Sequence, residues 1–218
     1  MFERLKESCR ADWDAYVQHP FVRGMATGDL PKECFQHYLK QDYLFLIHFA
    51  RAYALSIYKA ETIADMRYGM GAVSAILDTE LELHIAYCRE WGIDPEELEG
   101  LEEATANMAY TRYVLERGMS GTAVDLHVAL SPCAIGYAEV ADWIMKQEFT
   151  VLEGNPYRSW IDMYSSEDYK CVAGGAIHWL EEVDARLGPG EFERHATTFR
   201  DATRLEIRFW QMGLDLSE

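Results

Sequence analysis

The chain has 218 residues, of which 49% are hydrophobic and 13% aromatic, enough to bury a sizeable core. Its net charge of −17 argues against nucleic acid or an anionic membrane as a partner, because both would repel it. No run of about 18 apolar residues occurs, so no membrane span is expected, and Phe2–Glu7 reads as an amphipathic helix rather than a signal peptide. The five cysteines contain no C-x-x-C pair, which favours reduced thiols in a cytoplasmic protein over disulfides or a zinc site.

Apolar residues recur at helical spacing along almost the whole chain, and no segment alternates convincingly with period two. Loops are expected at Gly24, Gly28 and Pro31, and again at Asn155-Pro156. The predicted helices cover residues 2–18, 31–59, 62–91, a short segment opened by Asp94-Pro95, 102–117, 123–145, 166–187 and 190–216, with the turn Gly188-Pro189-Gly190 before the last. We therefore predict an all-α fold of seven or eight helices, in a single multi-helical domain over residues 1–218.

The helix predicted over residues 123–145 contains the tripeptide Ser131-Pro132-Cys133. Thr122 and Asp125 predict a capping box at its start. Proline lacks an N–H and clashes with the preceding turn, at a cost of roughly 3 kcal/mol, so we expect a kink or a restart there. Cys133 would then face inward beside unpaired backbone N–H groups, which can stabilise a thiolate. The alternative is a buried structural cysteine beside a harmless kink.

Two carboxylates interrupt apolar stripes. Asp42 lies on the inward face of the helix over residues 31–59, and Glu206 lies on that of the last helix. A carboxylate that faces a core is unfavourable unless it is paired, hydrogen-bonded or protonated. Each can serve a buried arginine, tyrosine or backbone group, but together with an inward Cys133 they predict catalytic groups around one central cavity.

Aromatic residues accompany these groups, and most of them are expected to be core packing. Tyr137 differs because it follows Cys133 by one helical turn and so points the same way. An apolar aromatic site with an acid, a base and a thiolate suits a flat, cationic or heteroaromatic ligand.

Five groups of residues then become recognisable in one order along essentially the whole chain. They are His19-Pro20-Phe21-Val22 with Gly28-Asp29-Leu30-Pro31, Tyr38-Leu39-x-Gln41-Asp42-Tyr43, Cys133-x-x-Gly136-Tyr137, Tyr157-x-x-Trp160-Ile161-x-x-Tyr164 and Glu206-x-x-Phe209-Trp210. On these motifs, each weak alone, the chain resembles the TenA family of thiaminase II or aminopyrimidine aminohydrolase proteins, and Cys133 resembles its cysteine-containing branch. The resemblance implies a haem-oxygenase-like all-α fold and a homotetramer.

The same resemblance implies roles for single residues. Cys133 would be the nucleophile that adds to a pyrimidine ring, Glu206 the acid and base at a ring nitrogen, and Asp42 the hydrogen-bonding partner of a ring nitrogen and the 4-amino group, which also helps to activate the thiol. The residues implied to line or stack on the ring are Phe45, Tyr110, Tyr137 and Phe209, while Tyr164 would position the reacting groups. Phe45 stands where family members carry a tyrosine, so only its ring contact would remain.

The implied reaction is the hydrolysis of 4-amino-5-aminomethyl-2-methylpyrimidine to the hydroxymethylpyrimidine, or the cleavage of thiamin to hydroxymethylpyrimidine and thiazole. It requires no metal and no organic cofactor. The expected partner is a small pyrimidine, not nucleic acid and not a membrane.

Two alternatives stay open. One is a non-catalytic pyrimidine-binding or regulatory protein, since residues alone do not demonstrate turnover. The other is a carboxylate-bridged metal oxidase, suggested by the pair Glu80 and His84 and the pair Glu139 and Asp142, although no Glu-x-x-His pair of the ferritin type occurs. His84 itself would be either a residue beside the pocket or a satisfied core histidine.

Overall fold

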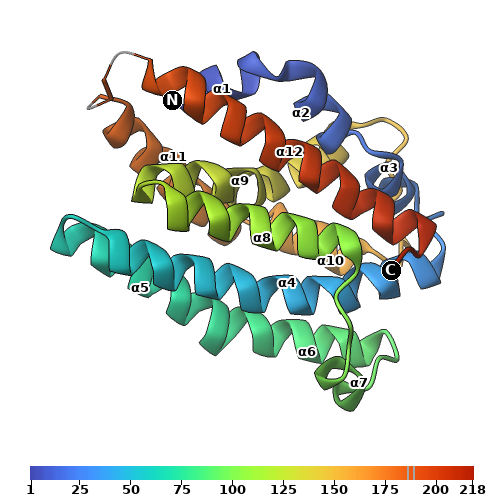
Figure 1. The fold of residues 1–218 in the computed structure, drawn as a ribbon. Helices are drawn as coiled ribbons and strands as arrows, with labels where there is room; N and C mark the ends of the chain where they lie inside the picture. The colour runs from blue at the N-terminus through green and yellow to red at the C-terminus, as the bar shows by residue number, and fades with distance from the viewer. Residues whose placement is uncertain (186, 189) are drawn as a thin grey trace. The chain divides into compact units, whose positions relative to one another are not determined.

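The computed structural model describes residues 1–185, 187, 188 and 190–218, without the side chains of residues 95 and 99. These described residues contain no β-strand, which confirms the predicted all-α class. One segment, η1, is a π-helix, in which each hydrogen bond spans five residues instead of four. In chain order the elements are α1 (Phe2–Ser8), α2 (Arg10–Val17), α3 (Pro20–Thr27), α4 (Lys32–Lys59), α5 (Ile63–Ala75), η1 (Ile76–Glu80), α6 (Leu81–Glu90), α7 (Pro95–Glu99), α8 (Thr105–Ser120), α9 (Ala123–Lys146), α10 (Arg158–Tyr164), α11 (Glu167–Asp184) and α12 (Glu191–Asp215) (Figure 1).

The described part of the chain has twelve α-helices, more than the seven or eight predicted, and the N-terminal region accounts for two of the additions. The helix predicted over residues 2–18 is divided at Cys9, whose φ of −135° and ψ of 37° leave the helical region. The expected loop after residue 18 contains α3, which His19 caps by accepting the N–H of Phe21 at Nδ1, 3.2 Å away. Helices of seven or eight residues make too few turns for a periodicity to be recognised.

The other predicted helices are found, with shifted ends. The helix predicted over residues 62–91 is α5, η1 and α6 in succession, and Thr62 caps it by accepting the N–H of Asp65 at 3.1 Å. The capping box at the start of α9 is confirmed, since Thr122 N–H donates to Asp125 at 2.8 Å and the N–H of Asp125 donates to Thr122 Oγ1 at 3.3 Å. α8 begins and ends three residues after its prediction, and α10 was not predicted. The predicted helix end at residue 187 and the turn around Pro189 fall partly outside the described residues.

The described residues fall into two compact units. Unit 1 comprises Met1–Pro31 and Val128–Gln211, and unit 2 comprises Lys32–His127 and Met212–Glu218. The chain passes from one unit to the other after Pro31, within α9 and within α12. The single domain over residues 1–218 stays a prediction. No helix in the described part of the chain is both long and apolar enough to cross a membrane.

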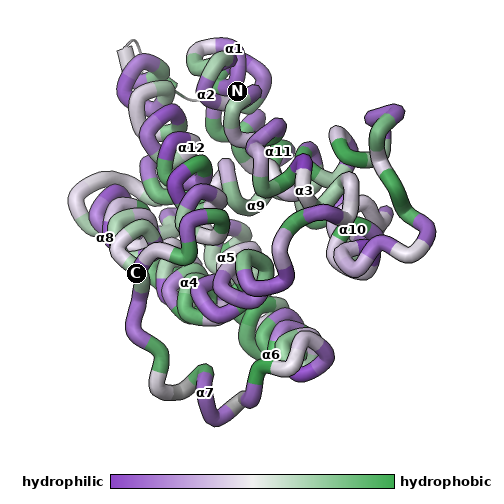
Figure 2. The backbone as a smooth tube through the Cα atoms, turned by 90° about the vertical axis from the view of Figure 1, so that its right-hand side faces the viewer, coloured by the Kyte–Doolittle hydropathy of each residue, from purple (hydrophilic) through white to green (hydrophobic). Residues whose placement is uncertain are grey.

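Unit 1 has an aromatic core. The indole of Trp13 stacks on Phe199 at 5.4 Å and meets the edge of Phe2 at 5.6 Å, while Trp210 stacks on Phe21 at 5.0 Å. Each aromatic side chain removes roughly 150–250 Å² from water, so this cluster is a major source of the unit's stability. Figure 2 shows hydrophilic and hydrophobic residues interspersed along α12, as expected for a helix with one buried face.

α9 runs through Pro132 as one helix, so the predicted restart there is wrong. Pro132 lacks the N–H that would donate to the carbonyl of Val128. The hydroxyl of Ser131 donates to that carbonyl at 2.8 Å, and the hydroxyl of Tyr16 donates to the carbonyl of Pro132 at 3.4 Å. These side chains compensate the proline within a continuous helix, and the helix break from which thiolate stabilisation at Cys133 is predicted does not occur.

In unit 2, Gln41 of α4 anchors the segment that joins α7 to α8. Its side-chain amide donates to the carbonyl of Glu102 at 3.0 Å and accepts the N–H of Ala104 at 2.9 Å. Asn107 donates to the same amide oxygen at 3.0 Å and to the backbone carbonyl of Gln41 at 2.9 Å. These bonds fix the segment before α8 against α4, because breaking one would leave a buried polar group without a partner, at a cost in folding free energy of about 1–3 kcal/mol.

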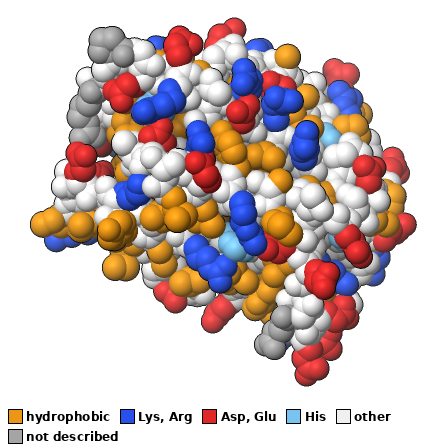
Figure 3. Space-filling model, viewed as in Figure 1, with side chains coloured by type: hydrophobic (Ala, Val, Ile, Leu, Met, Phe, Trp, Pro, Cys, Tyr) orange, Lys and Arg blue, Asp and Glu red, His pale blue; other side chains and the backbone are white. Residues whose placement is uncertain are grey.

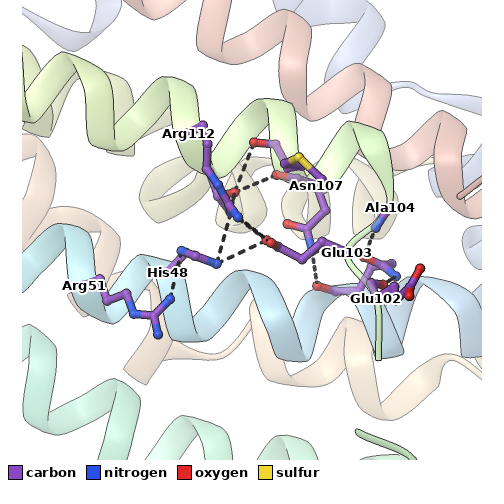
Figure 4. Close-up of polar contacts among 10 residues, drawn as sticks. His48, Arg51, Glu102, Glu103, Ala104, Asn107 and Arg112 are labelled. Atoms are coloured by element: carbon purple, nitrogen blue, oxygen red, sulfur yellow. Dashed lines mark hydrogen bonds and ion pairs between the residues drawn. The ribbon is translucent and has the colours of Figure 1, made fainter. Parts of the chain in front are cut away.

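An ion-pair network lies beside this anchor (Figure 4). The guanidinium of Arg112 binds the carboxylate of Glu103 with two hydrogen bonds of 2.7 and 2.5 Å, and His48 Nε2 lies 3.1 Å from the same carboxylate. The hydrogen bonds from Arg112 lower the pKa of Glu103. The network therefore ties α4 and α8 to the segment that joins α7 to α8, inside unit 2.

We expect Gly136→Ala to lower the free energy of unfolding by roughly 1–3 kcal/mol, because α9 and α2 approach closely there. A Cβ on Gly136 would lie 2.6 Å from Cε1 of Tyr16. Urea denaturation measures the change. The matched control is Gly174→Ala on α11, where a Cβ meets no described atom within 4 Å and where alanine should stabilise by roughly 0.5–1 kcal/mol. Equal stability of Gly136→Ala and wild type would contradict the close approach.

Candidate functional site

Unit 1 contains the predicted nucleophile and the aromatic residue that follows it. Cys133 and Tyr137 lie one turn apart on α9, and Cys133 is half-buried whereas Tyr137 is buried. The ring of Tyr137 lies 5.0 Å from that of Tyr164 on α10 and 5.4 Å from that of Trp210 on α12. The thiol therefore lies on the helix that also carries part of an aromatic cluster, while its place in a catalytic site stays a prediction.

α12 carries the second carboxylate of the prediction. Glu206 is 1% exposed, and Phe209, three residues later on the same helix, is also buried. The prediction that Glu206 faces inward is confirmed. A carboxyl group buried to this extent needs a partner or a proton, so it is chemically distinct from the exposed acidic residues of this chain.

Unit 2 contains the remaining predicted residues. Asp42 and Phe45 are buried on α4, and Tyr110 is buried on α8. The rings of Phe45 and Tyr110 are 5.1 Å apart. The prediction that Asp42 interrupts an apolar stripe and faces inward is confirmed.

Asp42 has ionisable neighbours on two other elements of unit 2. His84 of α6 places Nδ1 3.5 Å from Oδ2 of Asp42, and its Nε2 lies 2.9 Å from the backbone carbonyl of Leu39. Glu80, the last residue of η1, interacts electrostatically with Asp42. The sequence shows Glu80 and His84 one turn apart but does not predict that both accompany Asp42.

Burial changes the acidity of this cluster. Burial raises the pKa of Asp42 to about 7, opposed by a hydrogen bond with Tyr38. Burial and then the charge of Asp42 raise the pKa of Glu80 to about 7. Burial lowers the pKa of His84, opposed by its bond to the Leu39 carbonyl. The uncharged forms of all three groups are thus favoured near neutral pH.

The structure brings together some of the predicted site residues. In unit 1 it joins Tyr137 to Tyr164, and in unit 2 it joins Phe45 to Tyr110. Cys133 and Glu206 belong to unit 1, and Asp42 belongs to unit 2. The common cavity of these three stays a prediction.

Glu139 and Asp142, the acidic pair suggested for a metal oxidase, already bind lysine side chains and an indole N–H of the same chain. Glu139 binds the ammonium of Lys6 at 2.5 Å and the indole N–H of Trp13 at 2.9 Å, and Asp142 pairs with Lys170 at 3.4 Å. Among the described residues, no group of three or more histidine, cysteine or acidic side chains is arranged to hold a metal ion. These contacts favour a structural role for Glu139 and Asp142.

Comparison with known sequences finds relatives over the whole chain. The sequence model of the TENA/THI-4/PQQC family matches residues 7–216. An uncharacterized protein of Haemophilus influenzae is 45% identical over 217 residues, which is 100% of both chains. An aminopyrimidine aminohydrolase of Halalkalibacterium halodurans is 36% identical over 210 residues, which is 96% of this chain and 93% of the relative.

Solved structures show the same similarity. A crystal structure of a TenA family transcription regulator from a Silicibacter species has a TM-score of 0.92 at 41% identity, covering 98% of this chain and 96% of that one. A domain of Shewanella denitrificans with a heme oxygenase-like fold has a TM-score of 0.78 at 15% identity, covering 99% of this chain and 93% of that one, and supports the fold alone. The expected TenA resemblance and haem-oxygenase-like fold are confirmed.

We expect the contribution of Asp42 to stability to fall as the pH rises from 5 to 8, while His84 and His127, whose pKa values burial lowers, contribute in the opposite direction. The pKa of Asp42 is about 7 in the folded chain and about 3.9 in an unfolded one, so the folded state keeps a proton that the unfolded chain has lost. This difference removes roughly 1–4 kcal/mol of stability across the range. Asp42→Asn should therefore remove this contribution, so that between pH 5 and 8 the variant loses less stability, or gains more, than wild type, measured as the free energy of unfolding in urea at both pH values.

The matched control for that experiment is Glu82→Gln, which changes an exposed carboxylate on α6. It should keep the wild-type slope. An Asp42→Asn variant with the wild-type slope would show that Asp42 is ionised when the chain is folded at pH 5.

Proposed function

Because this chain belongs to the TENA/THI-4/PQQC family, we propose that it is a hydrolase of thiamin salvage. Its substrate would be 4-amino-5-aminomethyl-2-methylpyrimidine, converted to 4-amino-5-hydroxymethyl-2-methylpyrimidine and ammonia. Cleavage of thiamin to the same pyrimidine and a thiazole would be a second reaction of the same groups. The observation that carries the proposal is the similarity to an aminopyrimidine aminohydrolase over nearly the whole chain.

We assign nucleophilic catalysis to Cys133. Its thiolate would add to an electron-deficient carbon of the pyrimidine while a ring nitrogen takes up a proton. The electron-rich adduct can then expel the amine from the exocyclic methylene, so that the C–N bond breaks and ammonia leaves. Water adds to the methylene, the C–S bond breaks, and the aromatic ring returns. The half-buried position of Cys133 on α9 is compatible with this role.

We assign proton transfer to Glu206 and substrate orientation to Asp42. Glu206 would protonate the ring nitrogen as the thiolate adds and recover the proton when the thiolate leaves. Its nearly complete burial shields the carboxyl group from bulk water, which is compatible with this role. Asp42, whose pKa burial raises to about 7, would bind a ring nitrogen and the 4-amino group.

The aromatic residues would hold the flat ring of the substrate. The residues assigned to lining or stacking are Phe45, Tyr110, Tyr137 and Phe209, with Tyr164 as a positioning group. Aromatic contacts of this kind contribute roughly 0.5–1.5 kcal/mol per pair beyond burial alone.

A non-catalytic regulator is the second candidate function, because one related structure is described as a transcription regulator. The net charge of −17 disfavours direct binding of this chain to nucleic acid. A pyrimidine-binding protein that acts without turnover would need the aromatic residues but not the thiol. Loss of the thiol therefore separates the two candidates.

We expect Cys133→Ser to lower turnover by roughly 10³-fold or more while pyrimidine binding is kept, because a serine hydroxyl is a far weaker nucleophile than a thiolate. The measurement is chromatographic product analysis with the aminomethylpyrimidine and with thiamin as separate substrates. Cys171→Ser is the matched control, since Cys171 is exposed on α11. Turnover kept in Cys133→Ser would overturn the nucleophile assignment, and a wild type inactive on both substrates would favour a binding protein.

We also propose that the protein is a cytoplasmic homotetramer. The structure describes all five cysteines, and none of them forms a disulfide, which suits a reducing compartment. Unit 2 exposes several large apolar side chains, which Figure 3 shows gathered where α4 ends and α5 begins. They include Tyr58, Ile63, Met66, Met70 and Met119. Clustered apolar exposure of this kind marks interaction surfaces.

We expect wild type to have the mass of a tetramer in light scattering after size exclusion, and Met70→Glu to shift it to smaller species. Met70 is 60% exposed in the middle of α5, so the substitution should leave the fold intact while placing a charge on the apolar surface. Val172→Glu, at an exposed apolar residue of α11, is the control. A monomeric wild type, or a Met70→Glu variant of unchanged mass, would contradict this interface.

A further inference from the structure

The position of His84 determines which of its nitrogens carries a proton. Nε2 lies 2.9 Å from the backbone carbonyl of Leu39, and a carbonyl can only accept a hydrogen bond. Nε2 must therefore be the N–H donor of that bond. In a neutral imidazole, Nδ1 is then an acceptor with a bare lone pair.

This lone pair faces a carboxyl oxygen. Nδ1 of His84 lies 3.5 Å from Oδ2 of Asp42, and the two side chains are 9% and 10% exposed. A neutral imidazole and a carboxylate in this arrangement would oppose one acceptor to another, which is unfavourable away from water. A proton on Oδ2 turns this repulsion into an attraction, and a modest shortening of the 3.5 Å separation would complete a hydrogen bond to Nδ1.

We propose that Asp42 and His84 share one proton and that His84 is a positioning residue for Asp42. In the absence of ligand, the carboxyl O–H of Asp42 would point to Nδ1 of His84. When a 4-aminopyrimidine binds, the same O–H would donate to the ring nitrogen, while the other carboxyl oxygen accepts from the 4-amino group. No covalent bond changes in this exchange, because only the acceptor of one hydrogen bond is replaced. The identity of the ligand rests on the proposed function, whereas the shared proton does not.

The surroundings of the pair keep this proton in place. From α4, Tyr38 hydrogen-bonds to Asp42, and from η1, Glu80 adds a second carboxyl group. From α6, the thiol of Cys88 interacts electrostatically with Asp42 and with Lys40, whose ammonium pairs with Glu97. An ionised Glu80 would oppose the loss of the proton from Asp42. Burial acts in the same direction, since it raises the pKa of Asp42 and lowers that of His84.

The exchange explains why a core position would carry a histidine. The carboxyl group of a lone buried aspartic acid has several rotamers and no defined direction for its O–H. With His84 as acceptor, one direction is defined, and the pairing partner is released only by a ligand that offers an equivalent acceptor. A 4-aminopyrimidine offers this acceptor beside an N–H donor, in the order that a protonated carboxyl group matches.

The first test needs no ligand. In ¹⁵N-histidine NMR spectra, with His84 identified by the signal lost in His84→Gln, we expect a proton on Nε2 and a hydrogen-bonded, unprotonated Nδ1 from pH 6 to 7. Asp42→Ala should move the Nδ1 resonance toward that of a nitrogen without a hydrogen bond. A proton on Nδ1, or a resonance that ignores Asp42→Ala, would overturn the proposal.

The second test measures binding of 4-amino-5-hydroxymethyl-2-methylpyrimidine by calorimetry between pH 6 and 8.5. In wild type, the affinity should fall above pH 7, with proton uptake on binding, because the ligand requires a protonated Asp42. His84→Gln removes the acceptor that stabilises the protonated form, so the fall should begin roughly 0.5–1 pH unit lower. A purely structural histidine would change the affinity equally at every pH. His178→Gln, at an exposed histidine of α11, is the matched control.

The outcomes separate this proposal from the proposed function. If the protein shows the expected His84 tautomer but neither binds nor converts the aminopyrimidine, the shared proton is supported and the proposed function is refuted. If wild type and His84→Gln convert the aminopyrimidine with the same pH profile, the proposed function is supported and the positioning role of His84 is refuted. If His84→Gln does not fold, His84→Asn takes its place, and the spectra of wild type and Asp42→Ala still decide the tautomer.

Discussion

The interior of unit 2 contains ionisable groups that water does not reach well, and their arrangement constrains the helices around them. Asp42, Glu80 and His84 come from α4, η1 and α6. Burial disfavours the charged form of each, and the charge of Asp42 adds to this effect at Glu80. The helices must therefore meet with the side chains in register, so that one proton serves two groups. A packing error that an apolar core would absorb as a small cavity would here leave an ionisable group without its partner.

In unit 1 the groups that need partners are backbone carbonyls of α9. Pro132 removes one N–H from the middle of α9, and the hydroxyls of Ser131 and Tyr16 bind the carbonyl groups around it. Gly136 gives the ring of Tyr16 the space to do so. The residues around Cys133 therefore depend on one another. Tyr16 can bind the carbonyl of Pro132 only because Gly136 has no side chain, and these contacts accompany a helix that stays continuous at Cys133.

Much of this molecule is predictable from its sequence, for reasons that differ between features. The long helices α4 and α12 follow from apolar stripes, and the inward direction of Asp42 and Glu206 follows from their places in those stripes. The division at Cys9 and the helix α3 do not, because a few turns carry too little periodic signal. The continuity of α9 through Pro132 depends on Tyr16, which is 116 residues away in the chain, and the pairing of His84 with Asp42 depends on tertiary packing.

The π-helical turn η1 has a consequence for the evolution of chain length. A π turn is an α-helix that carries one extra residue, and such insertions are found often at functional sites. Deleting one residue from Ile76–Glu80 would restore a regular α-helix and rotate every following side chain of α6 by about 100°. His84 would then turn away from Leu39 and Asp42. A relative that lacks this residue can keep the histidine in its sequence and still have lost its partner, so a matched histidine reports the geometry of His84 only where the alignment has no gap across Ile76–Glu80.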